Sequence, residues 1–110
     1  MRLRVKNGHL TIEQSPEERV ILHLDAVRDT PNTMYDQSGY KRTANGIAAA
    51  TGIPYPSMAK LLCTMRDDGT VELHSLKYRT DQRQGNVYAL VYLLTPDGQK
   101  LAYEIRERLA

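Results

Sequence analysis

The amino-acid sequence predicts an α+β domain, with a three-helix core followed by a β-hairpin, a second hairpin at the N-terminus and a helix at the C-terminus. Three observations predict this class. Four segments have apolar residues at helical spacing, and three of these begin at helix-capping residues. An Asn7-Gly8 pair lies between two short alternating segments, as in a tight hairpin turn. Two further apolar segments after Gly69 are separated by a polar loop, which is typical of a second hairpin.

The 110 residues fit a single domain, which we divide into an N-terminal extension, 1–14, and a domain over 15–110. A hydrophobic content of 41% and a charged content of 25% are those of an ordinary globular chain. The net charge of +2 is mildly basic, which fits a nucleic-acid binder but also many other proteins. Cys63 is the only cysteine, so no internal disulfide can form, and no apolar run approaches the ~20 residues of a membrane span. We therefore expect a cytoplasmic protein with no membrane contact.

Residues 2–13 are predicted to form a β-hairpin that turns at Asn7-Gly8. Both central residues of a type I′ turn need positive φ, and an Asn-Gly pair meets that requirement well. The resulting register puts apolar residues on one face and polar residues on the other. Because an isolated hairpin is marginally stable, its apolar face must cover the domain or meet a partner. The expected pairs are Val5 with Leu10, Leu3 with Ile12, Arg4 with Thr11 and Arg2 with Glu13.

The first helix is predicted from Ser15 to about Arg28. Ser15 is its N-cap, Pro16 takes the first helical position, and Glu18 completes a capping box. The next segment, 30–40, is rich in turn-forming residues and is predicted to be a loop, with a short strand at its end left open. The apolar residues of the helix follow the helical period and form a core stripe: Val20, Ile21, Leu24 and Val27.

Two helices joined by a tight turn follow the loop. The first begins at the capping residue Thr43 and ends at Gly52, which suits the left-handed position that closes a helix. The second runs from about Tyr55 to Asp68, between prolines that bar continuation of the earlier helix and a glycine that ends the new one. The residues expected to face inward are Ile47 and Ala48 in the first helix and Met58, Leu61, Leu62 and Met65 in the second.

A hairpin and a last helix complete the chain. Strands are predicted over Val71–Tyr78 and Val87–Leu94, and the second is so continuously apolar that we expect it to be buried on both faces. The loop between the strands, 79–86, is polar and basic. Thr95 caps the last helix and Pro96 takes its first position. The apolar stripe of that helix is Leu101, Ala102, Ile105 and Leu109.

Three segments of this region resemble winged-helix transcriptional regulators of the archaeal and bacterial MarR-like group. They are T-A-N-G-I-A-A-A-T-G-I-P (Thr43 to Pro54), L-L-C-T-M-R-D-D-G-T-V (Leu61 to Val71) and V-Y-L-L-T-P-D-G-Q-K-L-A (Val91 to Ala102). The resemblance covers about half of the chain. It implies a winged helix-turn-helix in which the third helix lies in the DNA major groove and the hairpin, or wing, lies along the backbone. The implied function is sequence-specific binding of double-stranded DNA in transcriptional regulation. Because a single subunit offers few contacts, we expect a symmetric homodimer that reads two half-sites.

The candidate DNA contacts lie in three places. At the third helix, Ser57, Lys60 and Thr64 are expected at base edges or phosphates and Tyr55 at the backbone, although the same pattern fits a solvated helix face. Wing cations are expected at phosphates or in the minor groove, or serve only to keep a hairpin end soluble. Residues before the second helix are expected to hold a phosphate at its amino end, or act only as a cap. The full set is Lys41, Arg42, Thr43, Tyr55, Ser57, Lys60, Thr64, Lys77, Arg79 and Arg83.

Catalysis is not expected. The histidines, at positions 9, 23 and 74, have no metal-ligand spacing, and the sequence contains neither a phosphate-binding glycine loop nor a nucleophile elbow. We therefore predict no enzyme activity, no metal and no cofactor. Cys63 is interpreted as an inert thiol, with a redox switch at the DNA face as the alternative.

Other functions remain open at this stage. Asp67 and Asp68 place negative charge at the end of the third helix, which favours a winged helix that binds a protein partner. A third alternative is binding of single-stranded nucleic acid or RNA, with Tyr55, Tyr78 and Tyr88 as stacking platforms. The contact between the two subunits of a dimer is expected at the N-terminal hairpin, the last helix, or both.

Overall fold

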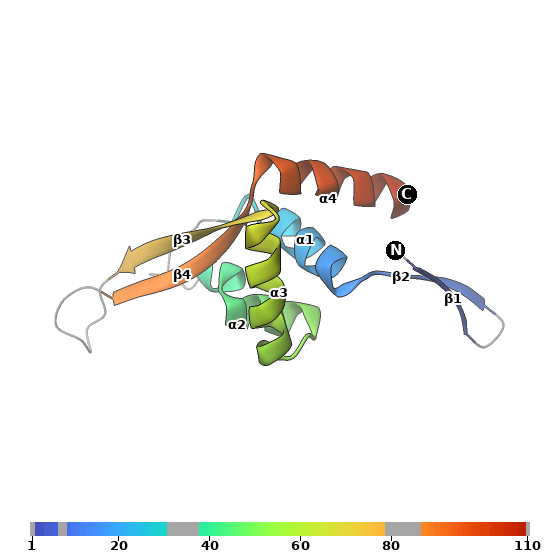
Figure 1. Cartoon of the computed structure of the whole chain (residues 1–110), viewed down its shortest axis with the longest axis horizontal. Coiled ribbons are helices and arrows are strands. Elements are labelled where there is room, and N and C mark those ends of the chain that lie inside the picture. The colour runs from blue at the N-terminus through green and yellow to red at the C-terminus, as the bar shows by residue number, and fades with distance from the viewer. Residues whose placement is uncertain (1, 7–8, 31–37, 79–86, 110) are drawn as a thin grey trace.

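The computed structural model describes residues 2–6, 9–30, 38–78 and 87–109 of the 110-residue chain. It confirms the predicted α+β class, with helices forming a central body and two hairpins extending from opposite ends of it (Figure 1). The elements in chain order are β1 (Arg2–Lys6), β2 (His9–Glu13), α1 (Pro16–Ala26), the 3₁₀ helix η1 (Ser38–Arg42), α2 (Ala44–Thr51), α3 (Tyr55–Asp67), β3 (Val71–Tyr78), β4 (Val87–Leu94) and α4 (Pro96–Leu109).

Helix α1 begins as the sequence predicts. The Ser15 side chain accepts a hydrogen bond from the Glu18 backbone N–H at 3.1 Å, and the Ser15 N–H donates to Glu18 Oε1 at 3.0 Å. These reciprocal bonds satisfy two N–H groups that a helix start leaves without intrahelical partners. The core stripe of the helix is buried as expected, with Val20 fully inaccessible.

Helix α2 is held very close to the segment that precedes it. Thr43 accepts from the Gly46 N–H at 3.0 Å and donates its hydroxyl to the Tyr40 carbonyl at 2.7 Å. A Cβ on Gly46 would lie 2.0 Å from that same carbonyl oxygen, so only glycine permits this approach. The segment is the 3₁₀ helix η1, not the short strand left open above, and β4 packs against it without strand pairing.

The turn between α2 and α3 is the predicted one. Gly52 has a φ of 73° and its N–H donates to the Ala48 carbonyl, which closes α2 in the left-handed conformation. Helix α3 starts after Pro54 and directs its apolar side inward. The core is built where α1, α2, α3, the base of the wing and α4 meet, and its most buried large side chains are Ile47, Met58, Leu62, Met65, Val20 and Val71.

Strands β3 and β4 form an antiparallel two-stranded ribbon, from Val71 opposite Leu94 to Tyr78 opposite Val87. The expectation that β4 is buried on both faces is wrong for its outer half. Val91 is fully buried, but Leu90 is 56% exposed. The reason is geometric, because successive residues of a strand point to opposite faces: the face that bears Val91 is covered, whereas the face that bears Leu90 and Tyr88 is open.

Helix α4 returns across the body and packs on α1. Thr95 accepts from the Gly98 N–H at 3.1 Å and donates its hydroxyl to the Gly69 carbonyl at 2.6 Å, so one side chain caps α4 and joins it to the start of the wing. Ala102 and Ile105 are buried as expected, whereas Leu101 and Leu109, predicted in the same stripe, are each 37% exposed.

The N-terminal hairpin has the predicted register. Val5 is opposite Leu10 and Leu3 is opposite Ile12, with Arg4 opposite Thr11 and Arg2 opposite Glu13. Figure 1 shows this ribbon extending from the start of α1, at the end of the molecule opposite the wing. The division into an extension, 1–14, and a domain, 15–110, stays a prediction.

Candidate nucleic-acid interface

The side of α3 turned away from the core is polar and open. Ser57, Lys60 and Thr64 are exposed, and Tyr55 at the first position of the helix is 51% exposed. The Thr64 hydroxyl donates to the Lys60 carbonyl one turn earlier, at 3.2 Å, so its oxygen still has acceptor capacity. These four predicted residues therefore lie along one accessible helix, which can present hydrogen-bond donors and one positive charge to a ligand.

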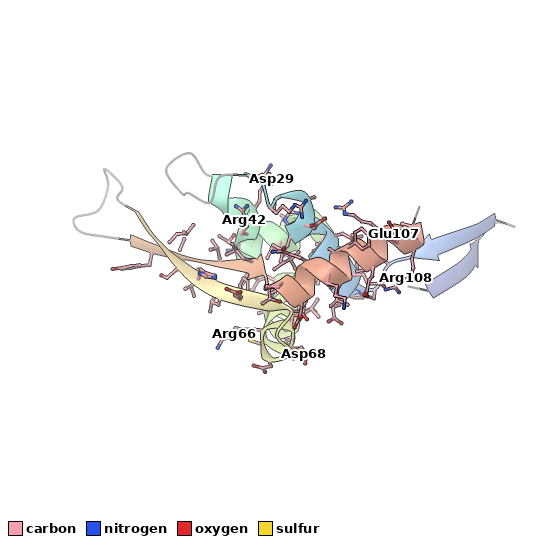
Figure 2. The ribbon with its side chains drawn as sticks, turned by 90° about the horizontal axis from the view of Figure 1, so that it is seen from above. Asp29, Arg42, Arg66, Asp68, Glu107 and Arg108 are labelled. Atoms are coloured by element: carbon pink, nitrogen blue, oxygen red, sulfur yellow. The ribbon has the colours of Figure 1, made fainter. Side chains whose placement is uncertain are left out.

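Arg66 adds a second cation to α3, and the sequence-based set did not include it. Its side chain is exposed. In Figure 2, Arg66 and Asp68 leave the end of the helix in different directions, with Arg66 on the side toward which the β3–β4 ribbon extends and Asp68 away from it. Whether this position faces the wing depends on how α3 packs against β3, which is tertiary information that the sequence pattern does not contain.

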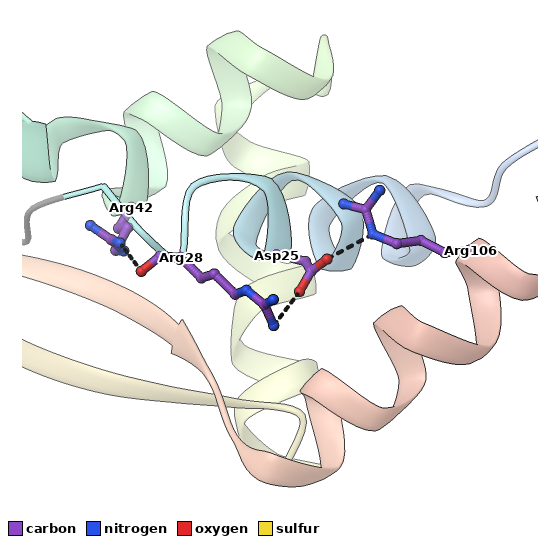
Figure 3. A network of polar contacts seen from close by, with 4 residues as sticks. All are labelled: Asp25, Arg28, Arg42 and Arg106. Atoms are coloured by element: carbon purple, nitrogen blue, oxygen red, sulfur yellow. Dashed lines mark hydrogen bonds and ion pairs between the residues drawn. The ribbon is translucent and has the colours of Figure 1, made fainter.

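The segment before α2 places its two cations very differently. Lys41 is exposed, and its carbonyl accepts from His23 Nε2 at 2.8 Å when that nitrogen carries the proton. Arg42 is only 3% exposed. Its guanidinium Nη2 donates to the carbonyls of Val27 and Thr30, at 2.5 and 2.7 Å. It also donates to the carbonyl of Arg28 at 3.2 Å, the contact drawn in Figure 3.

Arg42 is therefore the C-terminal cap of α1. The last carbonyls of a helix have no intrahelical partners, and a buried guanidinium supplies several donors at once. Burial lowers the pKa of Arg42 from its usual value, and the guanidinium is still charged at neutral pH. The expectation of a phosphate contact from this residue is accordingly corrected, because its donors face inward to the protein backbone.

Thr43 is also engaged within the protein. Its hydroxyl oxygen accepts from one backbone N–H and its proton goes to another backbone carbonyl, as described above for the start of α2. The side chain is half-buried. Thr43 fixes where α2 begins, which is the capping alternative considered for this residue.

The wing contributes the remaining predicted cations. The backbone of Lys77 pairs with Tyr88 in the β3–β4 ribbon. Arg79 and Arg83 lie outside the described residues. Their contribution to the interface stays a prediction from the sequence.

The inner part of the wing lies against α3. Burial raises the pKa of Tyr92, the nearby thiol of Cys63 and phenol of Tyr55 raise it further, and Arg66 acts in the opposite sense. All three of these neighbours belong to α3. Tyr92 is half-buried on β4, and the side chains that act on its pKa besides burial all belong to α3.

Among the described residues, no group of histidine, cysteine or acidic side chains is arranged to hold a metal ion. No helix in the same part of the chain is long and apolar enough to cross a bilayer.

Comparison with solved structures finds a similar fold in a mutant of S. aureus MepR. The TM-score is 0.58 at 18% sequence identity, and the match covers 88% of this chain and 58% of the MepR chain. At that identity the likeness concerns the fold alone, which is a winged helix. No protein-family model matches the chain, and no curated protein matches it.

Proposed function

We propose that this chain binds double-stranded DNA in a sequence-specific manner and regulates transcription. The observation that carries the proposal is the exposed face of α3, with Ser57, Lys60, Thr64 and Arg66 on a helix held beside a β-ribbon. A polar, cationic helix of this kind fits a major groove, where hydroxyl and ammonium groups meet base edges and phosphates. The winged-helix fold shared with MepR, a regulator of the MarR family, supports the same function.

In this proposal the contacts have distinct roles. Ser57, Lys60 and Thr64 meet base edges or phosphates, and Tyr55 meets the backbone beside the start of the helix. The wing cations Lys77, Arg79 and Arg83 bind phosphates, and Lys41 of η1 does so before the start of α2. Arg42 has no direct contact, since it caps α1.

We further propose that the protein acts as a homodimer. A groove of about 330 Å³ opens between α1 and α4 near the attachment point of the N-terminal hairpin, with Ile21, Leu101 and Ile105 in its lining. By its register, the hairpin has an apolar face formed by two cross-strand pairs. Burying such surfaces against a second copy would stabilise both, and two copies would double the number of DNA contacts.

The test compares two exposed lysines, one on α3 and one on α4. Lys60→Ala removes a cation from the proposed interface, whereas Lys100→Ala removes an exposed cation from α4. Binding to a duplex selected by the wild-type protein from a randomised pool is followed by fluorescence anisotropy across a salt series. We expect Lys60→Ala to weaken binding and to reduce the salt slope by about 0.9, as for one lost phosphate contact, or to relax base preference. Equal behaviour of both variants would remove α3 from the interface.

A second function is favoured by one observation. Tyr88 and Leu90 are 61% and 56% exposed on the wing, and exposed apolar side chains are typical of surfaces that bind proteins. The alternative is therefore a winged-helix module in a larger protein assembly. Replacing Arg79 and Arg83 together with alanine separates the two functions, because it should abolish DNA binding and leave a protein partnership intact.

A further inference from the structure

The wing has an apolar strip on one face that nothing in the described protein covers at its outer end. Tyr88, Leu90 and Tyr92 alternate along β4 and so point to one side of the ribbon, and we name these three residues the wing stripe. Their exposure changes along the strand. Tyr92 packs on the core, whereas Leu90 and Tyr88 are more than half exposed. A large apolar side chain at such an open position gains nothing for the isolated fold.

The wing stripe faces the α3 side of the ribbon. Val71 is the cross-strand partner of Leu94, and both lie on the same face as the stripe. That end of the face packs into the core with Leu62 and Met65 of α3. The opposite face of β4 bears Val91, which is fully buried, and β4 contacts α1 and η1. The uncovered residues therefore continue the surface that α3 presents.

The charges around the wing stripe select the kind of surface that could cover it. Arg66 on α3 is exposed on the side toward which the wing extends (Figure 2). A matching surface is apolar where it meets Leu90 and anionic where it meets Arg66. The deoxyribose wall of a DNA groove has this character, because apolar sugar edges lie between successive phosphates. Proteins that bind the minor groove use apolar side chains there.

We propose that Tyr88 and Leu90 pack against the deoxyribose wall of the minor groove that adjoins the major groove occupied by α3. This inference rests on the proposed DNA-binding function and adds a non-ionic contact to it. Removing the two side chains from water would strengthen binding without neutralising any phosphate. The contact would therefore affect affinity equally at low and high salt, unlike the contacts of Lys60 or Arg66.

The experiment uses the selected duplex and salt series of the previous section, with the full chain. Tyr88→Ser and Leu90→Ser are compared with Tyr103→Ser, which replaces a tyrosine of similar exposure, 66%, on α4. We expect each wing variant to bind about tenfold more weakly at every salt concentration, with the slope of log affinity against log salt unchanged. Tyr103→Ser should bind as the wild type does. Far-UV circular dichroism checks that all three variants keep the fold.

The other outcomes distinguish the proposed contact of the wing stripe from the proposed DNA-binding function. Wild-type binding with wing variants that match Tyr103→Ser would overturn the stripe contact and leave DNA binding in place. A loss that appears as a reduced salt slope would also overturn it, because phosphate contacts would then be responsible. If the wild-type protein binds neither the randomised pool nor any selected duplex, the proposed function fails and the stripe contact fails with it.

Discussion

At the scale of single residues, Arg42 and Arg19 serve the fold at helix ends, and Arg106 of α4 pairs with Asp25 of α1 at 2.7 Å (Figure 3). Arg42 donates to the carbonyls that end α1, and Arg19 of α1 donates through Nη1 to the carbonyl of Thr51, which ends α2, at 2.9 Å. Each helix end is therefore satisfied by a guanidinium from another segment. Arg42, which the sequence offers as a nucleic-acid contact, therefore donates to backbone carbonyls of the protein instead.

Arg42 and Lys41 provide a matched pair for testing this assignment. Arg42→Met should lower the free energy of unfolding by about 1–3 kcal/mol, because the Thr30 carbonyl loses its guanidinium donor and the Val27 carbonyl keeps only the N–H of Thr30. Lys41→Met, at an exposed neighbour, should change it by about 0.5 kcal/mol or less. Urea unfolding followed by circular dichroism measures both values.

The same two variants should also differ in DNA binding, but there the larger effect should come from the substitution of Lys41. Lys41→Met should reduce the salt slope of binding, whereas Arg42→Met should keep it under conditions in which the variant is folded. An Arg42 variant with unchanged stability and a reduced slope would show that Arg42 contacts DNA after all.

Sequence alone could not tell these two residues apart. Lys41 and Arg42 are adjacent, equally charged and equally close to the start of α2. Their difference depends on which of them faces the end of α1, a segment more than ten residues earlier, and that is decided by tertiary packing. Arg66 was missed for the same reason, since its place in the interface depends on the side of α3 along which the wing runs.

At the scale of elements, the approach of α2 to η1 depends on one glycine. Gly46→Ala should destabilise the protein by about 1–3 kcal/mol or more, because the added Cβ meets the Tyr40 carbonyl 2.0 Å away and both backbones must shift. Asn45→Ala, at the exposed position beside it, is the control and should change stability little. Thermal unfolding compares the two. A Gly46→Ala variant as stable as the wild type would mean that η1 does not pack here.

The capping box of α1 predicts a pH dependence. Burial acts to raise the pKa of Glu18, the hydrogen bonds with Ser15 act to lower it, and the resulting pKa lies below the usual 4.5. A carboxylate with a depressed pKa adds stability that is fully present above its unfolded pKa and is lost as pH falls through the lower, folded value. Gln at this position keeps the hydrogen bond without the charge.

We therefore expect the wild type to be more stable than Glu18→Gln near neutral pH, and the difference to shrink as pH falls from about 5 to below the folded pKa. Midpoints of thermal unfolding across that range measure it. A difference that does not change with pH would show that the Glu18 charge has no part in the cap.

Element boundaries were largely predictable because caps are local. Ser15, Thr43, Gly52 and Thr95 fix helix ends through contacts within a few residues, so the sequence contains the whole interaction. The exposure of β4 was not predictable in this way. An apolar run indicates that something covers the strand, but not whether the cover is the chain's own helices or a ligand.

At the scale of the whole molecule, the two ribbons extend from opposite ends of the helical body (Figure 1). The wing lies beside the proposed DNA face, and the N-terminal hairpin lies beside the α1–α4 groove. This separation allows DNA binding and self-association to use different surfaces. The resemblance over Thr43–Ala102 indicated the winged helix and the wing, but it contained nothing about how the hairpin at 2–13 is used.

The dimer proposal predicts the effect of truncation. Light scattering of the full chain should give twice the mass of one subunit, and removal of residues 1–14 should give the mass of a single subunit, because the hairpin would supply the contact with the second copy. A truncated protein that keeps the dimer mass would exclude the hairpin from the interface and leave α4 as the contact. A monomeric full-length chain would contradict the dimer itself.

The central claim is that α3 and the wing form a face for duplex DNA. Its most direct test is binding of the full chain to a labelled mixed-sequence duplex, followed by fluorescence anisotropy over a series of salt concentrations. We predict an affinity that falls linearly on a logarithmic plot against salt, with a slope that counts the phosphates neutralised. Absence of binding even at low salt would contradict the account and favour the protein-binding module.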